Sequence, residues 1–241
     1  MLLSTPGIVL HTVKYGESGL VVNILTREAG LQSYFAQGVR KSKSRMKANL
    51  FRPLCLVYLV VFHKEAPQLQ RIKEITITAP TLQIGADIRK TSIAIFISEL
   101  LLHVFRRQET SPATFDYIYD AIIRLDGIDE NFSGFHLQFM LQLTQHLGFS
   151  PTRNISDSNP YFSLREGTFQ KDFDPALQCL DKEVSRYFYI LSDPDMTHSS
   201  TLPISPSIRN KMISACLDYY KYHIAGFGEL KSLAVLESIF S

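Results

Sequence analysis

Short apolar runs broken by turns fill the first eighty positions of the chain. The runs are rich in β-branched and aromatic residues, and glycines stand in the breaks, a pattern typical of strands joined by tight turns. Five strands are predicted, over residues 8–15, 20–26, 31–37, 54–62 and 69–78. Residues 42–49 contain helix formers and no strand pattern, so a short helical turn is expected between the third and fourth strands. Five closely spaced strands with an element after the third predict an OB-fold barrel.

A helical period replaces the strand pattern after Pro80, with apolar residues recurring at i, i+3 and i+4. The apolar stripes run over residues 93–104, 115–122, 132–147 and 213–224, and further helices are expected over 175–191 and after GFGELKS. The segment YFSLREGTF, residues 161–169, suits a small hairpin. The sequence therefore predicts an α+β protein, with an OB-fold barrel over residues 1–79 and an all-α domain over 80–241 that carries the hairpin as an insertion.

Composition narrows the class of protein. The chain has 241 residues, of which 45% are hydrophobic and 20% charged, as in ordinary globular proteins. No apolar run reaches the roughly 18 residues that span a bilayer, and the N-terminus lacks the basic start of a signal peptide, so a cytoplasmic protein is expected. The three cysteines, Cys55, Cys179 and Cys216, have neither disulfide nor zinc-site spacing. We therefore expect no metal and no cofactor.

Charge is distributed unevenly along the chain. Residues 1–80 hold 11 Lys+Arg against 4 Asp+Glu, a net charge of +7, whereas the other residues have a net charge of −5. Such asymmetry favours an N-terminal module that binds a polyanion.

Most of this positive charge lies in QGVRKSKSRMKANLFRP, residues 37–53, which contains no acidic residue. Its cations are Arg40, Lys41, Lys43, Arg45, Lys47 and Arg52. A charge run is usually a solvated face, but this one has no acidic neighbours to form local ion pairs. Nucleic acid is favoured, because a row of cations can neutralise several phosphates at once. Tyr34 is the candidate for stacking on bases, although strand alternation leaves either Tyr34 or its neighbour Phe35 facing outward, with core packing the alternative for each.

Enzyme motifs are weak. Gly16-Glu17-Ser18-Gly19 lacks a residue of the nucleophile elbow and lies between two strands, and Gly226-Phe227-Gly228 has Lys231 where a dinucleotide fingerprint needs glycine. Two acidic clusters remain, Asp126 with Asp129 and Glu130, and Asp193 with Asp195, but both have turn contexts. A metal-dependent nuclease is the enzymatic alternative.

Four ordered segments resemble the RecO family of bacterial recombination mediators: YGES–LVVNILTREAGL, GVRKSKS, LGFSP…YFSLREGTF and GFGELKSL. The resemblance runs nearly end to end. It implies an OB-fold followed by a helical domain, no enzymatic activity, binding of single- and double-stranded DNA, and annealing of complementary strands. It also implies partnership with RecR in loading RecA onto DNA that is covered by single-stranded-DNA-binding protein. The family's basic segment matches Arg40, Lys41, Lys43 and Arg45, whereas Lys47 and Arg52 are added from charge.

Two positions depart from the family pattern. Some relatives carry a four-cysteine zinc site after LGFSP, but the loop here, TRNISDSN, has no cysteine; Gly228 stands where the family usually has a larger basic residue. The resemblance also implies a pocket for the acidic, apolar tail of single-stranded-DNA-binding protein. Arg106, Arg107 and Arg124 could line its rim, but favourable placement at helix C-termini is the preferred explanation for each. An RNA-binding OB-fold protein and a pure protein adaptor remain the other functional alternatives.

Overall fold

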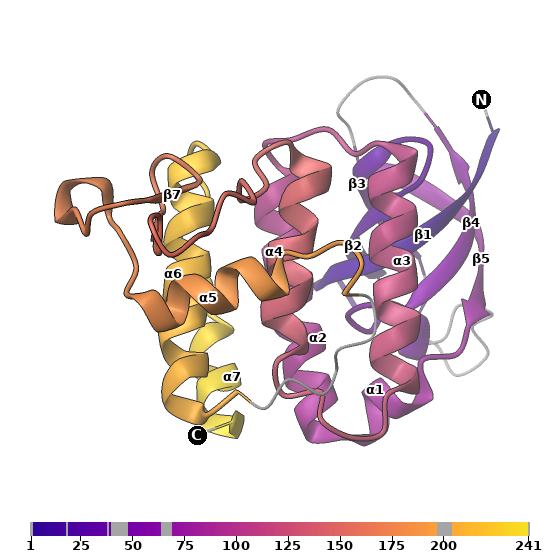
Figure 1. Ribbon diagram of the computed structural model, residues 1–241. Coiled ribbons are helices and arrows are strands. Elements are labelled where there is room, and N and C mark those ends of the chain that lie inside the picture. Colours follow the sequence, from indigo (N-terminus) through magenta and orange to yellow (C-terminus); the bar gives the residue numbers. More distant parts are fainter. Residues whose placement is uncertain are drawn as a thin grey trace. The chain divides into compact units, whose positions relative to one another are not determined.

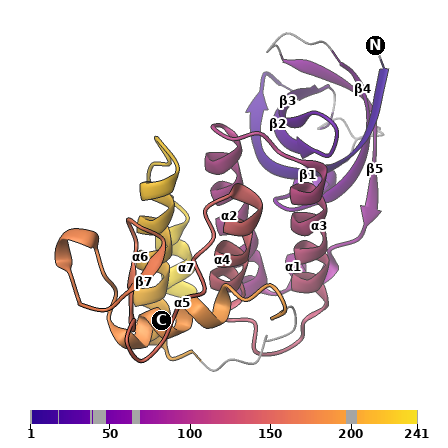
Figure 2. The same ribbon diagram turned by 45° about the horizontal axis from the view of Figure 1, so that its top comes forward.

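Five strands close into a barrel in the N-terminal part of the chain (Figure 1). The computed structural model describes residues 2–17, 19–37, 39, 48–63, 69–196 and 204–240. The strands are β1 (Leu2–Tyr15), β2 (Gly19–Thr26), β3 (Gly30–Ala36), β4 (Leu56–Phe62) and β5 (Gln70–Ala79). They follow the order β1-β2-β3-β5-β4, and Figure 2 shows them curling round one another. The five-stranded barrel predicted from the sequence is confirmed.

One pair of strands in the barrel is parallel. β3 and β5 pair only at Tyr34 with Gln70 and at Phe35 with Arg71, whereas the other pairings are antiparallel and longer. Between these two paired strands the chain passes through β4 and through the segments that join β4 to β3 and to β5. The helical turn predicted over 42–49 falls mostly outside the described residues, but a 3₁₀ turn, η1 (Ala48–Phe51), precedes β4.

The first strand is longer than predicted. Its expected start was Ile8, because Pro6 interrupts the apolar pattern, but β1 begins at Leu2. Pro6 lies opposite Tyr58 of β4, and its carbonyl accepts a hydrogen bond from the Arg27 amide at 3.1 Å, on the β2 side. The backbone of Pro6 thus points away from the β1–β4 ladder, which loses no donor to the proline.

Alternate residues of the strands fill the barrel, as the period of two requires. The core contains fully buried side chains from β1, β2, β3 and β4, among them Val9, Val22, Ile24, Tyr34, Val57, Leu59 and Val61. Leu50 and Phe51 of η1 join this core, and the Phe51 carbonyl accepts a hydrogen bond from the Thr12 hydroxyl at 2.9 Å. The turn before β4 is therefore fixed to the barrel wall.

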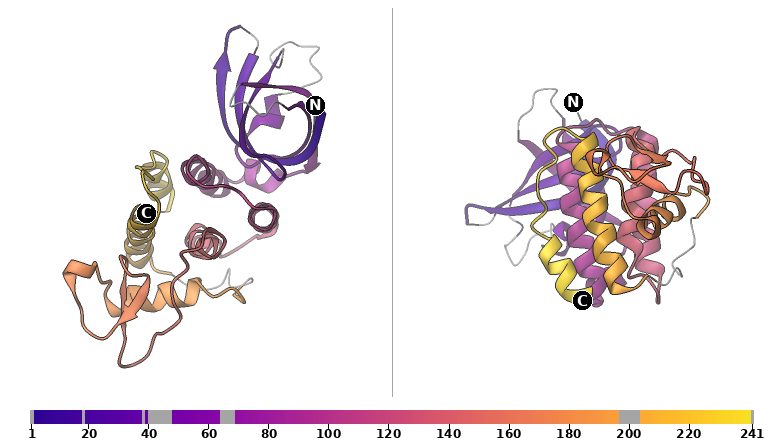
Figure 3. Two further views of the ribbon diagram at one scale, coloured as in Figure 1. Left: turned by 90° about the horizontal axis from the view of Figure 1, so that it is seen from above. Right: turned by 60° about the vertical axis from the view of Figure 1, so that its left-hand side comes forward.

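Three helices complete the first compact unit, which comprises residues 1–127 with 230–233. They are α1 (Leu82–Ala86), α2 (Ile88–Phe105) and α3 (Pro112–Gly127). The Asp87 carboxylate caps α2 through the Arg89 amide at 2.8 Å, and the Ser111 hydroxyl caps α3 through the Thr114 amide at 3.1 Å. Figure 3, left, shows the ring of strands, and α2 contacts β1.

The second compact unit comprises residues 128–229 with 234–241 and contains the predicted hairpin. Its elements are α4 (Phe135–Leu147), β6 (Tyr161–Ser163), β7 (Thr168–Gln170), η2 (Pro175–Leu177), α5 (Lys182–Leu191), α6 (Pro206–His223) and, from its second residue onward, α7 (Leu233–Phe240). The prediction of a helical region with a hairpin insertion is confirmed. The domain boundary predicted between residues 79 and 80 stays a prediction. The two compact units show which residues lie close together, but they do not show which segment can fold alone.

The helix predicted over 175–191 is wrong in its first half. η2 ends at Leu177, and Gln178 takes a left-handed backbone with φ 52°. Its carbonyl accepts a hydrogen bond from the Leu164 amide at 3.2 Å, and Cys179 forms a β-bridge with Ser163. Pairing with the hairpin has therefore overridden the helical pattern, and α5 begins only at Lys182.

Asn154 holds the loop that follows the LGFSP segment. Its amide group donates to the Phe169 carbonyl at 3.0 Å and accepts from the Phe169 amide at 2.9 Å, as a neighbouring strand would. Arg153 lies 4.1 Å from the Tyr189 ring centre and pairs with Asp193 at 2.8 Å. Side chains thus hold this loop, whose sequence TRNISDSN contains no cysteine.

Glu99 of α2 holds the end of the GFGELKSL segment. Its carboxylate accepts hydrogen bonds from the backbone amides of Lys231 and Ser232, at 3.1 and 2.8 Å, and from the Ser232 hydroxyl at 2.5 Å. Burial would raise the pKa of Glu99, but the hydrogen bonds from Ser232 and Lys231 outweigh it and hold the pKa below its ordinary value. The segment immediately before α7 is therefore held by a charged acceptor.

Candidate nucleic-acid interface

The predicted basic segment lies between two anchored points. Arg40, Lys41, Lys43, Arg45 and Lys47 fall outside the described residues, so their contacts stay a prediction. Before them, Val39 is buried in the barrel core, and after them Leu50 and Phe51 are buried there too. The described residues on both sides of positions 40–47 are therefore fixed in the barrel core.

Tyr34 is in the wrong place for the stacking role predicted for it. Its side chain has no exposed surface and belongs to the barrel core. Burial also raises its pKa to about 12. Its ring therefore fills the barrel and offers no face to a base. Phe35, the alternative left open by strand alternation, is the partly exposed neighbour.

Phe35 belongs to a row of residues that strand pairing places side by side on the outside of the barrel. Directly opposed residues of paired strands share one face of the sheet, so the register defines the row. We call it the outer row: Val13 of β1, Val21 of β2, Phe35 of β3, Arg71 of β5, Phe62 of β4 and Leu2 at the start of β1. Phe62 is 47% exposed and Leu2 52% exposed. The row combines apolar and aromatic surface with one cation.

A glycine makes room for the Phe35 ring. A Cβ at Gly19 would lie 2.6 Å from Cε2 of Phe35, closer than real contacts allow. Tyr15, 59% exposed, packs edge-on against the same ring with 5.7 Å between ring centres. Two aromatic side chains thus lie together beside the β1–β2 turn, where a base could stack on them.

Arg71 is the cation of the outer row. Its guanidinium donates to the Gln37 side chain at 2.8 Å, and no carboxylate of a described residue lies within ion-pair distance of it. Gln37 is three positions before Arg40, so Arg71 lies near the start of the basic segment. By contrast, the Arg27 guanidinium donates two hydrogen bonds to the Asp116 carboxylate, at 2.8 and 2.9 Å. This pairing raises the pKa of Arg27.

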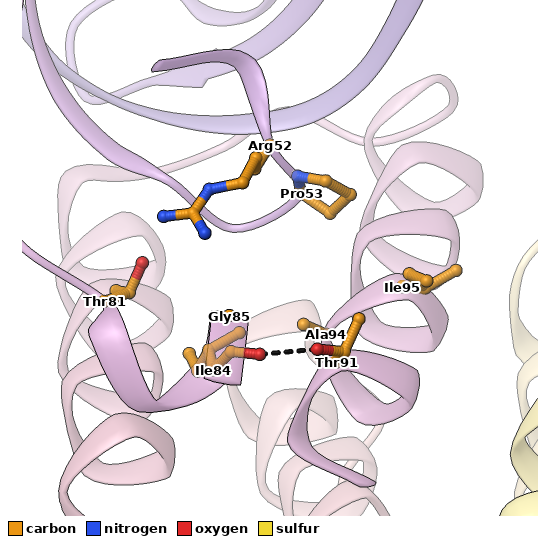
Figure 4. A pocket seen from close by; sticks show the side chains of 8 residues that line it. All are labelled: Arg52, Pro53, Thr81, Ile84, Gly85, Thr91, Ala94 and Ile95. Carbon is orange, nitrogen blue, oxygen red and sulfur yellow. Dashed lines mark hydrogen bonds between the residues drawn. The ribbon is translucent and has the colours of Figure 1, made fainter. Parts of the chain in front are cut away.

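Arg52 is described, but it lies apart from the outer row. It follows η1, donates to the Asn49 carbonyl at 3.3 Å and lines a pocket beside α1 and α2 (Figure 4). Arg106 and Arg107 are exposed at the end of α2, and Arg124 lies in the last turn of α3. The pocket that Arg52 lines does not include Arg106, Arg107 or Arg124.

The alternative motifs have structural explanations. Asp126 accepts a hydrogen bond from the Ile84 amide at 2.8 Å, and Asp193 binds Arg153. Within the described ranges no group of three or more His, Cys, Asp or Glu side chains could hold a metal ion. Gly16 forms a turn with φ 61°, and Gly226 and Gly228 also have left-handed backbones. Asp126 and Asp193 thus bind groups of the protein itself.

Comparisons with known proteins match this architecture in order. A family model described as "Recombination protein O N terminal" matches residues 1–81, and one described as "Recombination protein O C terminal" matches residues 85–234. The chain belongs to the RecO family. RecO proteins act in DNA repair and recombination as mediators without enzymatic activity.

Curated RecO relatives cover the whole chain. Proteins named "DNA repair protein RecO" are 35% identical in Flavobacterium psychrophilum, 33% in Christiangramia forsetii and 32% in Azobacteroides pseudotrichonymphae, each over 100% of both chains. Among the described residues, no helix is long and apolar enough to cross a membrane.

Sequence reasoning left the choice between Tyr34 and Phe35 open, committed to Tyr34, and missed Arg71 as a member of the candidate interface. Alternation along a strand shows that Tyr34 and Phe35 point to opposite faces of β3. It does not show which of the two faces the barrel core. Arg71 is 36 positions further along the chain and joins Phe35 through the parallel pairing of β3 with β5, which local pattern does not reveal.

Proposed function

We propose that this protein is a DNA-binding recombination mediator whose barrel, residues 1–79, binds single- and double-stranded DNA along the outer row and the basic segment. The observation that supports this best is Arg71: a cation without a carboxylate partner among the described residues, paired across strands with Phe35 and Phe62. Neighbouring aromatic and cationic side chains are what a single strand needs, because bases stack while phosphates are neutralised.

The affinity for DNA is expected to depend little on the base sequence of the DNA. Phosphate contacts from Arg40, Lys41, Lys43, Arg45 and Lys47 would position the DNA, because such contacts carry no sequence information. Phe35 and Tyr15 would stack on bases of any kind, since every base has an aromatic face. The interface therefore suits a protein that acts on whatever strand is exposed at a site of repair.

Annealing follows from the same chemistry. Two complementary strands repel each other, and one cationic surface lowers that repulsion while base pairing supplies the free energy. Neither ATP nor a metal ion is needed for that step. The proposed protein contacts are RecR and single-stranded-DNA-binding protein, with RecA loaded indirectly, and they are assigned to the helical domain, residues 80–241. The protein is expected to act in the cytoplasm, at the nucleoid.

A salt series with a charge-cluster variant tests the proposal. The affinity for a fluorescent single-stranded oligonucleotide is measured at several salt concentrations for the wild type and for the triple variant Arg40→Ala/Lys41→Ala/Lys43→Ala. If about five phosphates are engaged, the log–log slope of the wild type is about −3.5, and the triple variant has a shallower slope by about 2.

A matched variant removes the same charge elsewhere. Lys182→Ala/Lys211→Ala/Lys221→Ala lies in the second compact unit, where Lys211 pairs with Asp181 and Lys221 with Asp218. It should keep the wild-type slope. An unchanged slope in the first triple variant would contradict the proposed surface. A strong preference for RNA in competition would favour the RNA-binding alternative, and cleavage of DNA with magnesium would favour a nuclease.

A further inference from the structure

Residues 230–233 belong to the first compact unit, although the residues on both sides of them belong to the second. We call this short segment the clasp. Because of this division the chain passes between the two units at three places, after residue 127, after residue 229 and after residue 233. Two of the three places flank the clasp. If the clasp were released from the first unit, the covalent connection between the units would be reduced to the chain that follows residue 127.

One side chain of the first unit binds the clasp. The Glu99 carboxylate accepts hydrogen bonds from the Lys231 amide at 3.1 Å, from the Ser232 amide at 2.8 Å and from the Ser232 hydroxyl at 2.5 Å. Hydrogen bonds to a charged acceptor are stronger than those between neutral groups. Leu230 and Ser232 are buried, whereas Lys231 between them is exposed. A single carboxylate therefore holds two consecutive residues of the clasp.

Glycines lie on the N-terminal side of the clasp. Gly226 and Gly228 have φ angles of 69° and 77°, in the left-handed region that glycine enters without steric cost. Phe227 lies between them and is buried in the second unit, with 5.3 Å between its ring centre and that of Tyr220. The chain is thus fixed in the second unit at Phe227, and Gly228 can absorb a change of backbone angles immediately before the clasp.

The helix α7 lies on the C-terminal side of the clasp and enters the second unit from its second residue onward. Leu236 is the one buried residue of this helix. At its last residue, the Arg209 guanidinium donates to the Phe240 carbonyl and lies 5.4 Å from the centre of the Phe240 ring. A carboxylate at the amides before a helix and a guanidinium at its last carbonyl both complement the helix dipole. Opposite charges therefore hold the two ends of α7, Glu99 from the first unit and Arg209 from the second.

We propose that the clasp is releasable and that, when closed, it limits the movement of the second compact unit relative to the first. In the closed state Glu99 binds the clasp. In the open state the clasp leaves Glu99, Gly228 takes new backbone angles, and the clasp remains with α7. Opening breaks three hydrogen bonds and exposes Leu230, far less than the unfolding of either unit requires, so it occurs as a local event. Compact units of one chain move relative to each other by default, and a second tether restricts that movement.

Hydrogen exchange at individual amides of the full chain, followed by NMR, tests whether Glu99 closes the clasp. Glu99→Gln keeps the size of the side chain and removes its charge. The Lys231 and Ser232 amides should exchange about tenfold or more faster in this variant, because the exchange rate follows the population of the open state. Ser232→Ala removes one of the three hydrogen bonds and should accelerate the exchange of the Lys231 amide by a smaller factor.

Glu109→Gln is the matched control for charge. Glu109 is exposed, lies four positions beyond the end of α2 and belongs to the same unit as Glu99. This variant should keep the wild-type exchange rates at residues 231 and 232. The amides of the barrel strands should keep their wild-type rates in Glu99→Gln as well, because opening of the clasp leaves the barrel folded.

Distances between two spin labels test whether opening frees the second unit. Thr76→Cys and Glu183→Cys place the labels on exposed residues of the first and the second unit, and the three natural cysteines are buried. The distribution of distances between the labels should be broader when Glu99→Gln is added than in the labelled protein alone or with Glu109→Gln.

Three results would overturn the proposal. Unchanged exchange of the Lys231 and Ser232 amides in Glu99→Gln would show that the carboxylate does not close the clasp. Exchange that accelerates equally in the barrel strands would show a loss of global stability in place of a local opening. Faster exchange in the clasp with an unchanged distribution of label distances would show that the clasp does not limit the movement of the second unit.

Discussion

Aromatic residues gather in two regions of this molecule and do different work in each. In the second compact unit, Phe162, Phe188 and Tyr219 are buried, with 5.1 Å between the ring centres of Phe162 and Phe188 and 5.5 Å between those of Phe162 and Tyr219. On the barrel, Phe35 and Tyr15 pack against each other at the surface, and Arg71 lies opposite Phe35. The first group satisfies its own contacts, whereas the second leaves ring surface and positive charge for a ligand.

Individual cations also differ in whether a carboxylate neutralises them. In the second compact unit Arg153, Lys211 and Lys221 each pair with an aspartate. Among the residues that the structure describes, the hydrogen-bond partner of Arg71 is the neutral side chain of Gln37. An aromatic ring therefore indicates a binding site only where it is exposed beside a cation that no carboxylate has neutralised.

The largest expected effect is on the buried group. Phe162→Ala should lower the free energy of unfolding by about 3–5 kcal/mol, because a buried ring leaves a cavity behind. Urea denaturation measures this change. Phe35→Ala, the matched change on the barrel surface, should cost less than about 1 kcal/mol. Similar losses in the two variants would mean that the two aromatic groups do not differ as described.

Phe35→Ala should act on DNA binding instead. Loss of one stacking ring costs about 1–3 kcal/mol of affinity for single-stranded DNA, or roughly five- to hundredfold. Anisotropy with a labelled oligonucleotide measures it. Tyr34→Phe, which removes only a hydroxyl inside the barrel, is the control and should bind as the wild type does. Wild-type affinity in Phe35→Ala would remove the outer row from the interface.

The interior of the second unit should also respond to pH. Burial, helped by the charge of Arg209, lowers the pKa of His136 to about 3 from 6.5. The unfolded chain binds a proton below pH 6.5 and the folded chain does not, so stability is complete above pH 6.5 and falls as the pH decreases toward 3. The loss from this group is about 1.4 kcal/mol at pH 5.5.

His136→Phe separates this effect from other titrations. Urea midpoints are compared between pH 7.5 and 5.5 for the wild type and the variant. The variant should lose less stability over that interval, because phenylalanine binds no proton. An identical loss in both proteins would show that His136 does not carry the effect.

Arg71→Gln should have the smallest effect. Removal of one phosphate contact makes the log–log salt slope for single-stranded DNA shallower by about 0.7. Arg27→Gln is the matched control, because its guanidinium is already bound by Asp116. The two variants lose the same formal charge, so equal changes in slope would indicate a general field effect in place of a contact at Arg71.

Much of the fold could be predicted from the sequence. The strands of the barrel and the hairpin over 161–169 have local patterns, and Gly148 ends α4 with the left-handed backbone that glycine favours. The errors arose where contacts with residues distant in the sequence determine the local backbone structure. Gln178 leaves the helical pattern because the hairpin binds it, and Pro6 is accepted in β1 because its backbone points away from β4.

The candidate site was less predictable for the same reason. The basic segment is visible in the sequence because cations without acidic neighbours are a local property. The choice between Tyr34 and Phe35 depends on which face of β3 closes the barrel, and the addition of Arg71 depends on a parallel pairing between strands that are far apart in sequence. Arg52 has the charge expected of the segment but a different environment, set by α1 and α2.

The position of the Phe35 ring depends on Gly19. The ring packs against the Gly19 backbone, and even a single methyl group there would displace the ring. If bases stack on Phe35 as proposed, a methyl-sized substitution at residue 19 would weaken that stacking through the displaced ring, without any contact between residue 19 and the DNA.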